Sequence, residues 1–158
     1  MNNLIIRPAR SDDLDNLVQL EKNCFDTDLM SRKSFQRLLK VSSALILVVQ
    51  KDDVIIGSAT LFFRKKSDTA RIYSFAIEHT YRKQGLASQL NKAIEKYVRE
   101  RECMTIVLEV RLDNIAAIKF YLKQGYVING RYIKFYEDDA DALRMEKIIY
   151  AKRKRYIS

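Results

Sequence analysis

Apolar and polar residues follow two different periods along the chain, and these periods predict an ordered series of strands and helices. Short apolar or alternating runs predict strands at residues 4–7, 44–49, 54–63, 71–77, 105–112, 127–135 and 142–150. Apolar residues three or four positions apart predict helices at residues 12–24, 34–40, 86–98 and 114–123. The order β-α-α-β-β-β-α-β-α-β-β indicates a mixed sheet with helices on its faces.

Two of the predicted strands carry finer expectations about burial. Residues 105–112 are apolar almost throughout, which is typical of a strand buried on both faces. In residues 71–77, simple alternation sets Ile72, Ser74 and Ala76 opposite Tyr73, Phe75 and Ile77. Gly125 follows the last predicted helix, where a glycine readily adopts the left-handed conformation that ends a helix.

The length and composition bound the kind of protein. The chain has 158 residues, of which 47% are hydrophobic, and this length predicts a single domain over residues 1–158. No apolar run approaches the ~20 residues of a membrane helix. The first residues lack the charged and apolar regions of a signal peptide. We therefore expect a cytoplasmic protein without a membrane segment.

The few cysteines and histidines exclude several classes of site. Two cysteines, Cys24 and Cys103, cannot form a disulfide framework or a four-thiolate zinc site. The single histidine, His79, excludes centres with several histidine ligands. His79 lies in a polar stretch and is expected in a solvated loop, and Cys24 is expected to be a small buried apolar residue. We expect no metal site.

The net charge of +9 favours anionic partners, such as nucleic acid, the ribosome, a membrane surface or a phosphorylated cofactor. Part of the excess lies in the basic tail at residues 152–155, and one interpretation of this tail is a contact with nucleic acid or the ribosome. A solvated terminus that aids solubility is the alternative interpretation of this tail.

A turn between a predicted strand and a predicted helix carries the first chemical signal. Residues 82–88 read Arg-Lys-Gln-Gly-Leu-Ala-Ser and lead into the 86–98 helix. The free amides at a helix start and the helix dipole together make a site for a pyrophosphate. The spacing fits neither a P-loop nor a dinucleotide-binding fingerprint. By itself this turn is a weak signal.

A second motif makes the first one specific. Residues 109–121 read Glu-Val-Arg-Leu-Asp-Asn-Ile-Ala-Ala-Ile-Lys-Phe-Tyr and are followed by Gly125-Tyr126. Together with the turn, this run resembles the GNAT acetyltransferases, and most closely the bacterial ribosomal-protein-alanine N-acetyltransferases. The resemblance covers most of the chain. It implies an α+β GNAT fold with three α/β/α layers and a mixed, mostly antiparallel sheet of about seven strands.

The resemblance also implies an acetyl-CoA site and two catalytic residues. In these enzymes the strand before the turn, the turn itself and an asparagine bind acetyl-CoA as a co-substrate. The matching residues here are Phe75, Ala76, Ile77, Lys83, Gln84, Gly85, Leu86, Ala87, Ser88 and Asn114. Glu109 matches the proposed general base and Tyr121 the acid that protonates the departing thiolate. Ala87 stands where many members have glycine, a change that the motif permits.

The spacing of the two catalytic candidates is compatible with their pairing, although each has a plainer explanation. Glu109 lies ~13 Å before Asp113 along a strand, and Tyr121 lies ~12 Å after it along a helix. A helix that folds back over its strand would bring both side chains to similar depth. The alternatives are a structural ion pair between Glu109 and Arg111, and a plain core position for Tyr121.

Two acidic segments stand out in this basic chain. In GNAT folds the acceptor enters between the connection of the first two helices and the loop of the last two strands, which are residues 25–30 and 135–141 here. Their carboxylates belong to Asp26, Asp28, Glu137, Asp138, Asp139 and Asp141. Carboxylates at this place would attract a cationic amine. Solvated acidic turns are the alternative.

The sequence thus favours an acetyl-CoA-dependent N-acetyltransferase whose acceptor is a primary amine, expected at a peptide or protein N-terminus. Two other functions stay open. One is acetylation of a small cationic amine. The other is a non-catalytic CoA-binding module associated with the ribosome or with RNA. The oligomeric state is not predicted.

Overall fold

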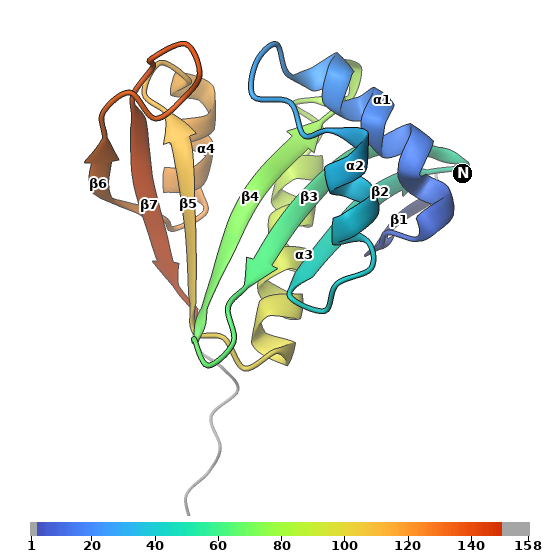
Figure 1. Cartoon of the computed structure of the whole chain (residues 1–158), viewed down its shortest axis with the longest axis horizontal. Coiled ribbons are helices and arrows are strands. Elements are labelled where there is room, and N and C mark those ends of the chain that lie inside the picture. The colour runs from blue at the N-terminus through green and yellow to red at the C-terminus, as the bar shows by residue number, and fades with distance from the viewer. Residues whose placement is uncertain (1–2, 150–158) are drawn as a thin grey trace, which may run out of the picture.

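A computed structural model describes residues 3–149 of the chain (Figure 1). The strands are β1 (Leu4–Pro8), β2 (Ala44–Lys51), β3 (Val54–Phe63), β4 (Thr69–Ile77), β5 (Thr105–Arg111), β6 (Val127–Tyr132) and β7 (Ala142–Ile148). The helices are α1 (Leu14–Cys24), α2 (Arg32–Leu38), α3 (Leu86–Glu100) and α4 (Ile115–Lys123), with short 3-10 helices η1 (Ser11–Asp13) and η2 (His79–Tyr81). The predicted order is confirmed. The basic tail and the last residue of the final predicted strand lie outside the described residues.

The strands form one seven-stranded sheet in the order β1-β2-β3-β4-β5-β7-β6. The pairing of β4 with β5 is parallel, and the other strand pairs of this sheet are antiparallel. The parallel pair arises because α3 carries the chain from the end of β4 back to the start of β5. The predicted mixed, mostly antiparallel α+β fold is therefore confirmed.

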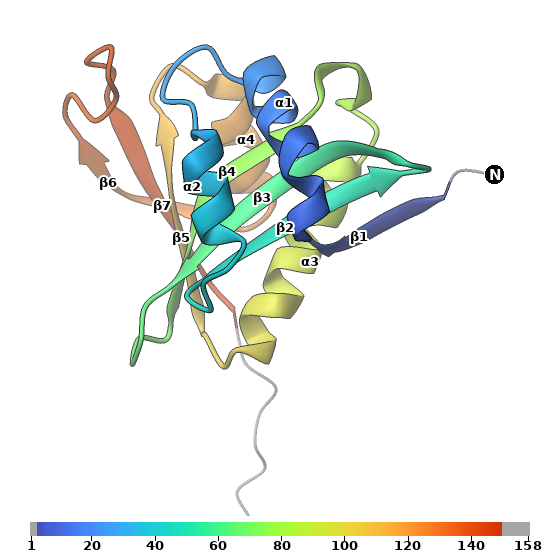
Figure 2. The ribbon, with the colours of Figure 1, turned by 45° about the vertical axis from the view of Figure 1, so that its right-hand side comes forward.

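Helices cover both faces of the sheet and create two cores (Figures 1 and 2). On one face, α1 and α2 bury Leu17 and Phe35 against β2. On the other face, α3 and α4 enclose a larger core that includes Leu90, Ile94 and Tyr121. This arrangement is the predicted three-layer α/β/α architecture. No helix within residues 3–149 is long and apolar enough to cross a membrane.

The prediction that β5 is buried on both faces is wrong. Ile106, Leu108 and Val110 are buried, whereas the residues between them are only half-buried. The reason is that α1 and α2 lie over β2, β3 and β4 and leave the same side of β5 and β7 without a helical cover (Figure 1). We call this side of β5, β7 and β6 the open face. Glu109 lies on it.

A buried polar network ties α3 to the end of α4 and to β7. Asn91 is fully buried and its amide donates to Glu95 at 2.8 Å and to Gln124 at 3.3 Å. Its oxygen accepts the Tyr126 hydroxyl at 3.0 Å. Lys147 of β7 completes the network with an ion pair to Glu95 at 3.1 Å. Each buried group in the network thus has a partner, which is the condition for such a network to be stable.

We predict that Asn91→Ala lowers the free energy of unfolding by about 2 kcal/mol, because it leaves the buried Tyr126 hydroxyl without its partner and removes one of the hydrogen bonds to the buried Glu95 carboxylate. Urea denaturation measures this change. Gln89→Ala, at an exposed position of the same helix, is the control and should change the free energy by less than about 0.5 kcal/mol. Equal, small effects of both substitutions would contradict this assignment.

Candidate active site

A bulge in β4 shapes the region where the predicted site residues gather. In the pairing of β3 with β4, Thr60 faces Ser74 and Leu61 faces Ile72, so Tyr73 is an extra residue. The parallel pairing of β4 with β5 ends at the same place, at Ile72. A bulge bends its strand, and β4 and β5 diverge beyond this point (Figure 1).

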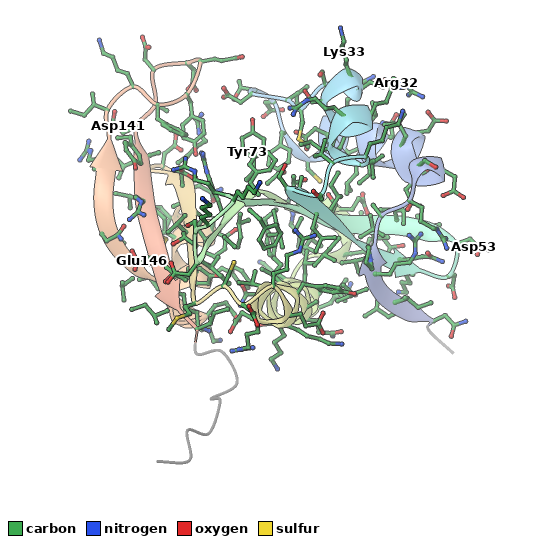
Figure 3. All side chains as sticks on the ribbon, turned by 60° about the horizontal axis from the view of Figure 1, so that its bottom comes forward. Arg32, Lys33, Asp53, Tyr73, Asp141 and Glu146 are labelled. Carbon is green, nitrogen blue, oxygen red and sulfur yellow. The ribbon has the colours of Figure 1, made fainter. Side chains whose placement is uncertain are left out.

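The bulge also corrects the predicted alternation in β4. Ile72, Phe75 and Ile77 all face the core of α3, whereas Tyr73 is half exposed. Figure 3 shows Tyr73 on the side of the sheet where α1 and α2 lie. The expected set of Tyr73, Phe75 and Ile77 on one face is therefore wrong, because the extra residue shifts the alternation by one position.

The turn before α3 has the features of an anion site. Gly85 has φ 80° and ψ 3°, a left-handed conformation that favours glycine, and Lys83 has φ 63°. The first backbone bond of the helix joins Gln89 N to Gly85 O at 3.1 Å. The amides of residues 86–88 therefore precede the helical ladder and are free to bind an anion.

The side chains of the turn divide into two groups. Lys83 and Gln84 are exposed beside the free amides. Leu86 is buried and Ala87 packs against the core, so that these two residues offer only backbone groups to a ligand. The Ser88 hydroxyl accepts a hydrogen bond from Gln124 at 2.7 Å, which directs it toward the end of α4.

The predicted backbone contacts of Phe75, Ala76 and Ile77 lie on the divergent part of β4. Pairing with β5 covers only residues 69–72. On that edge, the backbone groups beyond Ile72 have no strand partner within the described chain and are open to an extended ligand. The Ile77 carbonyl is an exception because it accepts a bond from Arg82 Nε at 3.0 Å. This bond ties the turn to the end of β4.

Asn114 caps α4. Its side-chain oxygen accepts a hydrogen bond from the Ala117 amide at 3.1 Å. The side-chain NH₂ group of Asn114 is the part that can serve a ligand. The motif residue therefore has a structural role that the sequence analysis did not assign to it.

Glu109 pairs with Arg71 and not with Arg111. Arg71 of β4 approaches both carboxylate oxygens, with Nε–Oε2 at 3.1 Å and Nη2–Oε1 at 2.9 Å. Arg111 instead contacts Asp113 and Asp138. The alternative of a Glu109–Arg111 ion pair is therefore wrong. Each of these two side chains has an oppositely charged partner elsewhere, on β4 for Glu109 and in the loops for Arg111. The Glu109 side chain is 13% exposed.

Tyr121 lies on the other side of the sheet, in the core of α3 and α4. Its ring packs edge-on against Phe75 of β4, at 5.9 Å between centroids, and against Tyr126, at 5.4 Å. Burial, and secondarily the neighbouring hydroxyl of Tyr136, raise the pKa of Tyr121 above its usual value. The phenol therefore keeps its proton throughout the neutral range.

The two acidic segments lie at the end of the sheet where β4 and β5 diverge (Figure 1). The Glu137 amide donates a hydrogen bond to Asp28 at 3.3 Å, which joins the segments to each other. Arg111 binds both oxygens of Asp138, at 3.0 and 2.7 Å, and lowers its pKa. The charge of Asp138 is thus compensated within the loop.

The loop also binds the carboxylate of Asp141, so that fewer of the predicted acidic residues have an uncompensated charge. This carboxylate accepts bonds from the Lys134 amide at 2.9 Å and from Arg131, and both lower its pKa. Among the carboxylates of the two segments, Asp26, Asp28, Glu137 and Asp139 form no salt bridge within residues 3–149.

Two residues of this region were not found from the sequence. Arg71 is one of them. The other is Tyr136, whose pKa is raised to about 12 by burial and by the carboxylate of Glu109. Arg111 lies over the Tyr136 ring at 5.0 Å. The hydroxyl of Tyr136 in turn contributes to the raised pKa of Tyr121. An aromatic residue inside an acidic loop was the signal for it.

His79 is exposed as predicted, whereas Cys24 is half-buried and not buried. Burial raises the pKa of the Cys24 and Cys103 thiols, and Cys24 is half-buried next to the Ile77 carbonyl. His79 is exposed in η2. In the described part of the chain, no three His, Cys, Asp or Glu side chains are grouped so that they could hold a metal ion.

Comparisons with known proteins point to one family. Residues 12–126 match the Acetyltransferase (GNAT) family. A candidate ribosomal protein bS18-alanine N-acetyltransferase of Bacillus subtilis is 29% identical over 141 residues, which cover 89% of this chain and 92% of that protein.

Solved structures share the fold. The ribosomal-protein-S18-alanine N-acetyltransferase of Escherichia coli has a TM-score of 0.84 at 24% identity, over 99% of this chain and 100% of that chain. A candidate streptothricin acetyltransferase of Bacillus anthracis, solved with acetyl coenzyme A, has a TM-score of 0.78 at 22% identity, over 94% and 98% of the two chains.

Proposed function

The chain belongs to the acetyltransferase (GNAT) family, and we propose that it transfers the acetyl group of acetyl-CoA to the N-terminal amine of a peptide or protein. The observation that carries this proposal is the divergence of β4 and β5 beside the free amides of α3. Glu109 lies on one face of the sheet at this place and Tyr121 on the other. The names of the Bacillus and Escherichia proteins, which refer to alanine of a ribosomal protein, support a protein acceptor.

The residues around the turn suit acetyl-CoA. The amides of residues 86–88 and the exposed Lys83 offer hydrogen bonds and positive charge to the diphosphate. The free edge of β4 at Phe75 offers main-chain groups to the amide-rich arm of the molecule, whereas Ala76 pairs with Ser58 of β3. Asn114 contributes its NH₂ group. Acetyl-CoA would supply the acetyl group as a thioester, whose sulfur is a good leaving group.

Glu109 and Tyr121 have complementary tasks in this proposal. A protonated amine is not a nucleophile, so Glu109 accepts its proton before nitrogen bonds to the acetyl carbon. Tyr121 donates its proton to the sulfur as the carbon–sulfur bond breaks, and the second proton that the nitrogen loses passes through solvent and restores the Tyr121 phenol. The free backbone amide of Phe75 donates to the acetyl oxygen, on which negative charge develops.

The cysteines favour direct transfer over an acetylated enzyme. Burial raises the pKa of the Cys24 thiol, and only the thiolate is a good nucleophile. A transfer through Cys24 would therefore lack its reactive form at neutral pH. We propose that the amine attacks the thioester directly while both substrates are bound.

The acidic segments support an acceptor that is cationic beside its amine. The carboxylates of Asp26, Asp28, Glu137 and Asp139 are without a salt bridge at this end of the sheet, and opposite charge raises the rate of encounter. Asp138 and Asp141 are held by arginines of the loop and are not part of this proposal. We expect a preference for Arg or Lys close to the acetylated end.

A thiol-release assay with three acceptor classes tests the proposed function. The classes are peptides with a free N-terminus, peptides with a blocked N-terminus and an internal Lys, and small polyamines. Turnover with the first class alone supports the proposal. Turnover only with small amines would favour acetylation of a small cationic amine, which the same acidic segments would also attract. No turnover with any class would favour a CoA-binding module.

We predict that Tyr121→Phe lowers kcat about tenfold and leaves the affinity for acetyl-CoA unchanged, because it removes only the proton donor. The effect is moderate because a thiolate is a weaker base than a phenolate and leaves with little help. The ring contacts of Tyr121 are kept, so the melting temperature serves as the control. An unchanged kcat would contradict the acid role.

The pH profile tests the same residue independently. A general acid must be protonated, so its activity is lost as pH rises through its pKa. Burial raises the pKa of Tyr121 above the usual value of about 10. We therefore predict that deprotonation of Tyr121 causes no loss of wild-type kcat below about pH 10. Any loss that occurs below this pH should persist in Tyr121→Phe, because it arises from another group.

A further inference from the structure

The contact between Arg71 and Glu109 is a two-point contact across adjacent strands. Arg71 lies on β4 opposite Val107 of β5. The next residue, Ile72, is the last that pairs with β5, and the bulge residue Tyr73 follows it. Its Nε and Nη2 atoms reach the two different oxygens of Glu109, at 3.1 and 2.9 Å. Such a fork fixes the plane of a carboxylate, whereas a single contact leaves it free to turn.

Arg71 is itself held in place from the other side. Its guanidinium carbon lies 5.8 Å from the centroid of the Tyr73 ring. Tyr73 in turn packs against Phe62, with 4.8 Å between ring centroids. The Arg71 side chain is 39% exposed and the Glu109 side chain 13% exposed, so that Glu109 is the more enclosed partner. The bulge residue Tyr73, two positions after Arg71 in the chain, thus supports the guanidinium with its ring.

The fork leaves part of Glu109 available for chemistry. A carboxylate has about four lone pairs, of which Arg71 engages one on each oxygen. The remaining lone pairs are the ones that an amine approaching the open face can reach. A carboxylate free to rotate would present them in this direction for only part of the time.

We propose that Arg71 is a positioning residue, which holds the Glu109 carboxylate in the orientation that accepts a proton from the acceptor amine. This inference rests on the proposed function of Glu109 as the base. Arg71 acts through Glu109 in this proposal and makes no contact with the turn before α3 within the described residues. Its loss should therefore reduce kcat and spare the affinity for acetyl-CoA.

Arg144 provides a matched control. It lies directly opposite Glu109 in the pairing of β5 with β7, on the same open face. It nevertheless bonds to Glu146, at 3.5 Å. Arg144→Ala removes the same charge at a neighbouring position without removing the fork, and should leave kcat within about twofold of the wild type.

A double-mutant cycle tests the proposal. Wild type, Arg71→Ala, Glu109→Gln and the double variant are compared for kcat and for the affinity of acetyl-CoA. Arg71→Ala should lower kcat about tenfold, since small misplacement of a catalytic group is costly. The double variant should match Glu109→Gln within about twofold, because Arg71 has nothing left to position.

Two further measurements distinguish a loss of carboxylate positioning from a loss of folded protein. Millimolar guanidinium, far below denaturing concentrations, should restore part of the activity of Arg71→Ala and none of that of the double variant. Arg71→Lys should recover only part of kcat, because an ammonium is a point charge and cannot form the fork.

The possible failures are distinguishable. If Glu109→Gln keeps the wild-type kcat, the proposed base is wrong, and the inference about Arg71 falls with it. If Glu109→Gln is impaired while Arg71→Ala is not, only the inference about Arg71 is overturned. Losses that multiply in the double variant, or an absence of guanidinium rescue, would also overturn it, because Arg71 would then act independently of Glu109.

Discussion

Glu109→Gln is expected to lower kcat by about two to three orders of magnitude at neutral pH, the range typical for loss of a general base. The substitution keeps the size and planar shape of the side chain and removes its ability to take a proton. Without it, the amine must lose its proton to water. An N-terminal amine has a pKa of about 8, so raising the pH to 9 should recover part of the lost rate.

Glu146→Gln is the matched control for this prediction. Glu146 is another half-buried carboxylate on the open face, bonded to Arg144 and Asn129. Its substitution changes the net charge in the same way and should leave kcat nearly unchanged. If both variants behave alike, or if Glu109→Gln gains nothing from higher pH, Glu109 is not the base.

Gly85→Glu is expected to raise the dissociation constant of acetyl-CoA about 100-fold or more, which corresponds to about 3 kcal/mol. A side chain at φ 80° is strained, and a carboxylate beside the free amides of α3 repels a diphosphate. A Cβ at this position would meet no atom within 4 Å. The loss should therefore arise at the anion site and not from a clash in the core. Isothermal titration calorimetry measures it.

Gly125→Ala controls for the backbone strain. Gly125 also has a positive φ, of 96°, but lies at the end of α4 beside Lys147. Its substitution should lower the stability of the protein and leave the acetyl-CoA affinity intact. An unchanged affinity of Gly85→Glu, with the circular dichroism spectrum of the folded protein, would refute the assignment of the turn.

Local patterns were enough to predict the order of the elements, and the structure shows where they were not. The boundaries of β3 match the predicted residues 54–63, because turn residues mark both of its ends. The burial of β5 could not be inferred from its apolar sequence, because burial depends on which strands α1 and α2 cover. The bulge at Tyr73 was likewise hidden, since it is a property of the pairing with β3.

The candidate site was predictable to the extent that it follows contiguous motifs. The turn before α3 and the run from Glu109 to Tyr121 were found because their residues are neighbours in the sequence. Arg71 was missed because it reaches Glu109 from another strand, and Tyr136 was missed because it lies in the loop between β6 and β7. The position of Arg71 in space depends on the register of β4 with β5, and that of Tyr136 depends on the path of the β6–β7 loop. A local sequence pattern contains neither.

The most direct test of the proposed function is to locate the acetyl group on a single acceptor that offers two amines. A synthetic peptide that begins with Ala and Arg and contains an internal Lys is incubated with the protein and acetyl-CoA, and tandem mass spectrometry assigns the modified position. The proposed function predicts one acetyl group on the N-terminal amine, and none on the same peptide with a blocked N-terminus. An acetyl group on the Lys side chain, or no acetylation of either peptide, would contradict it.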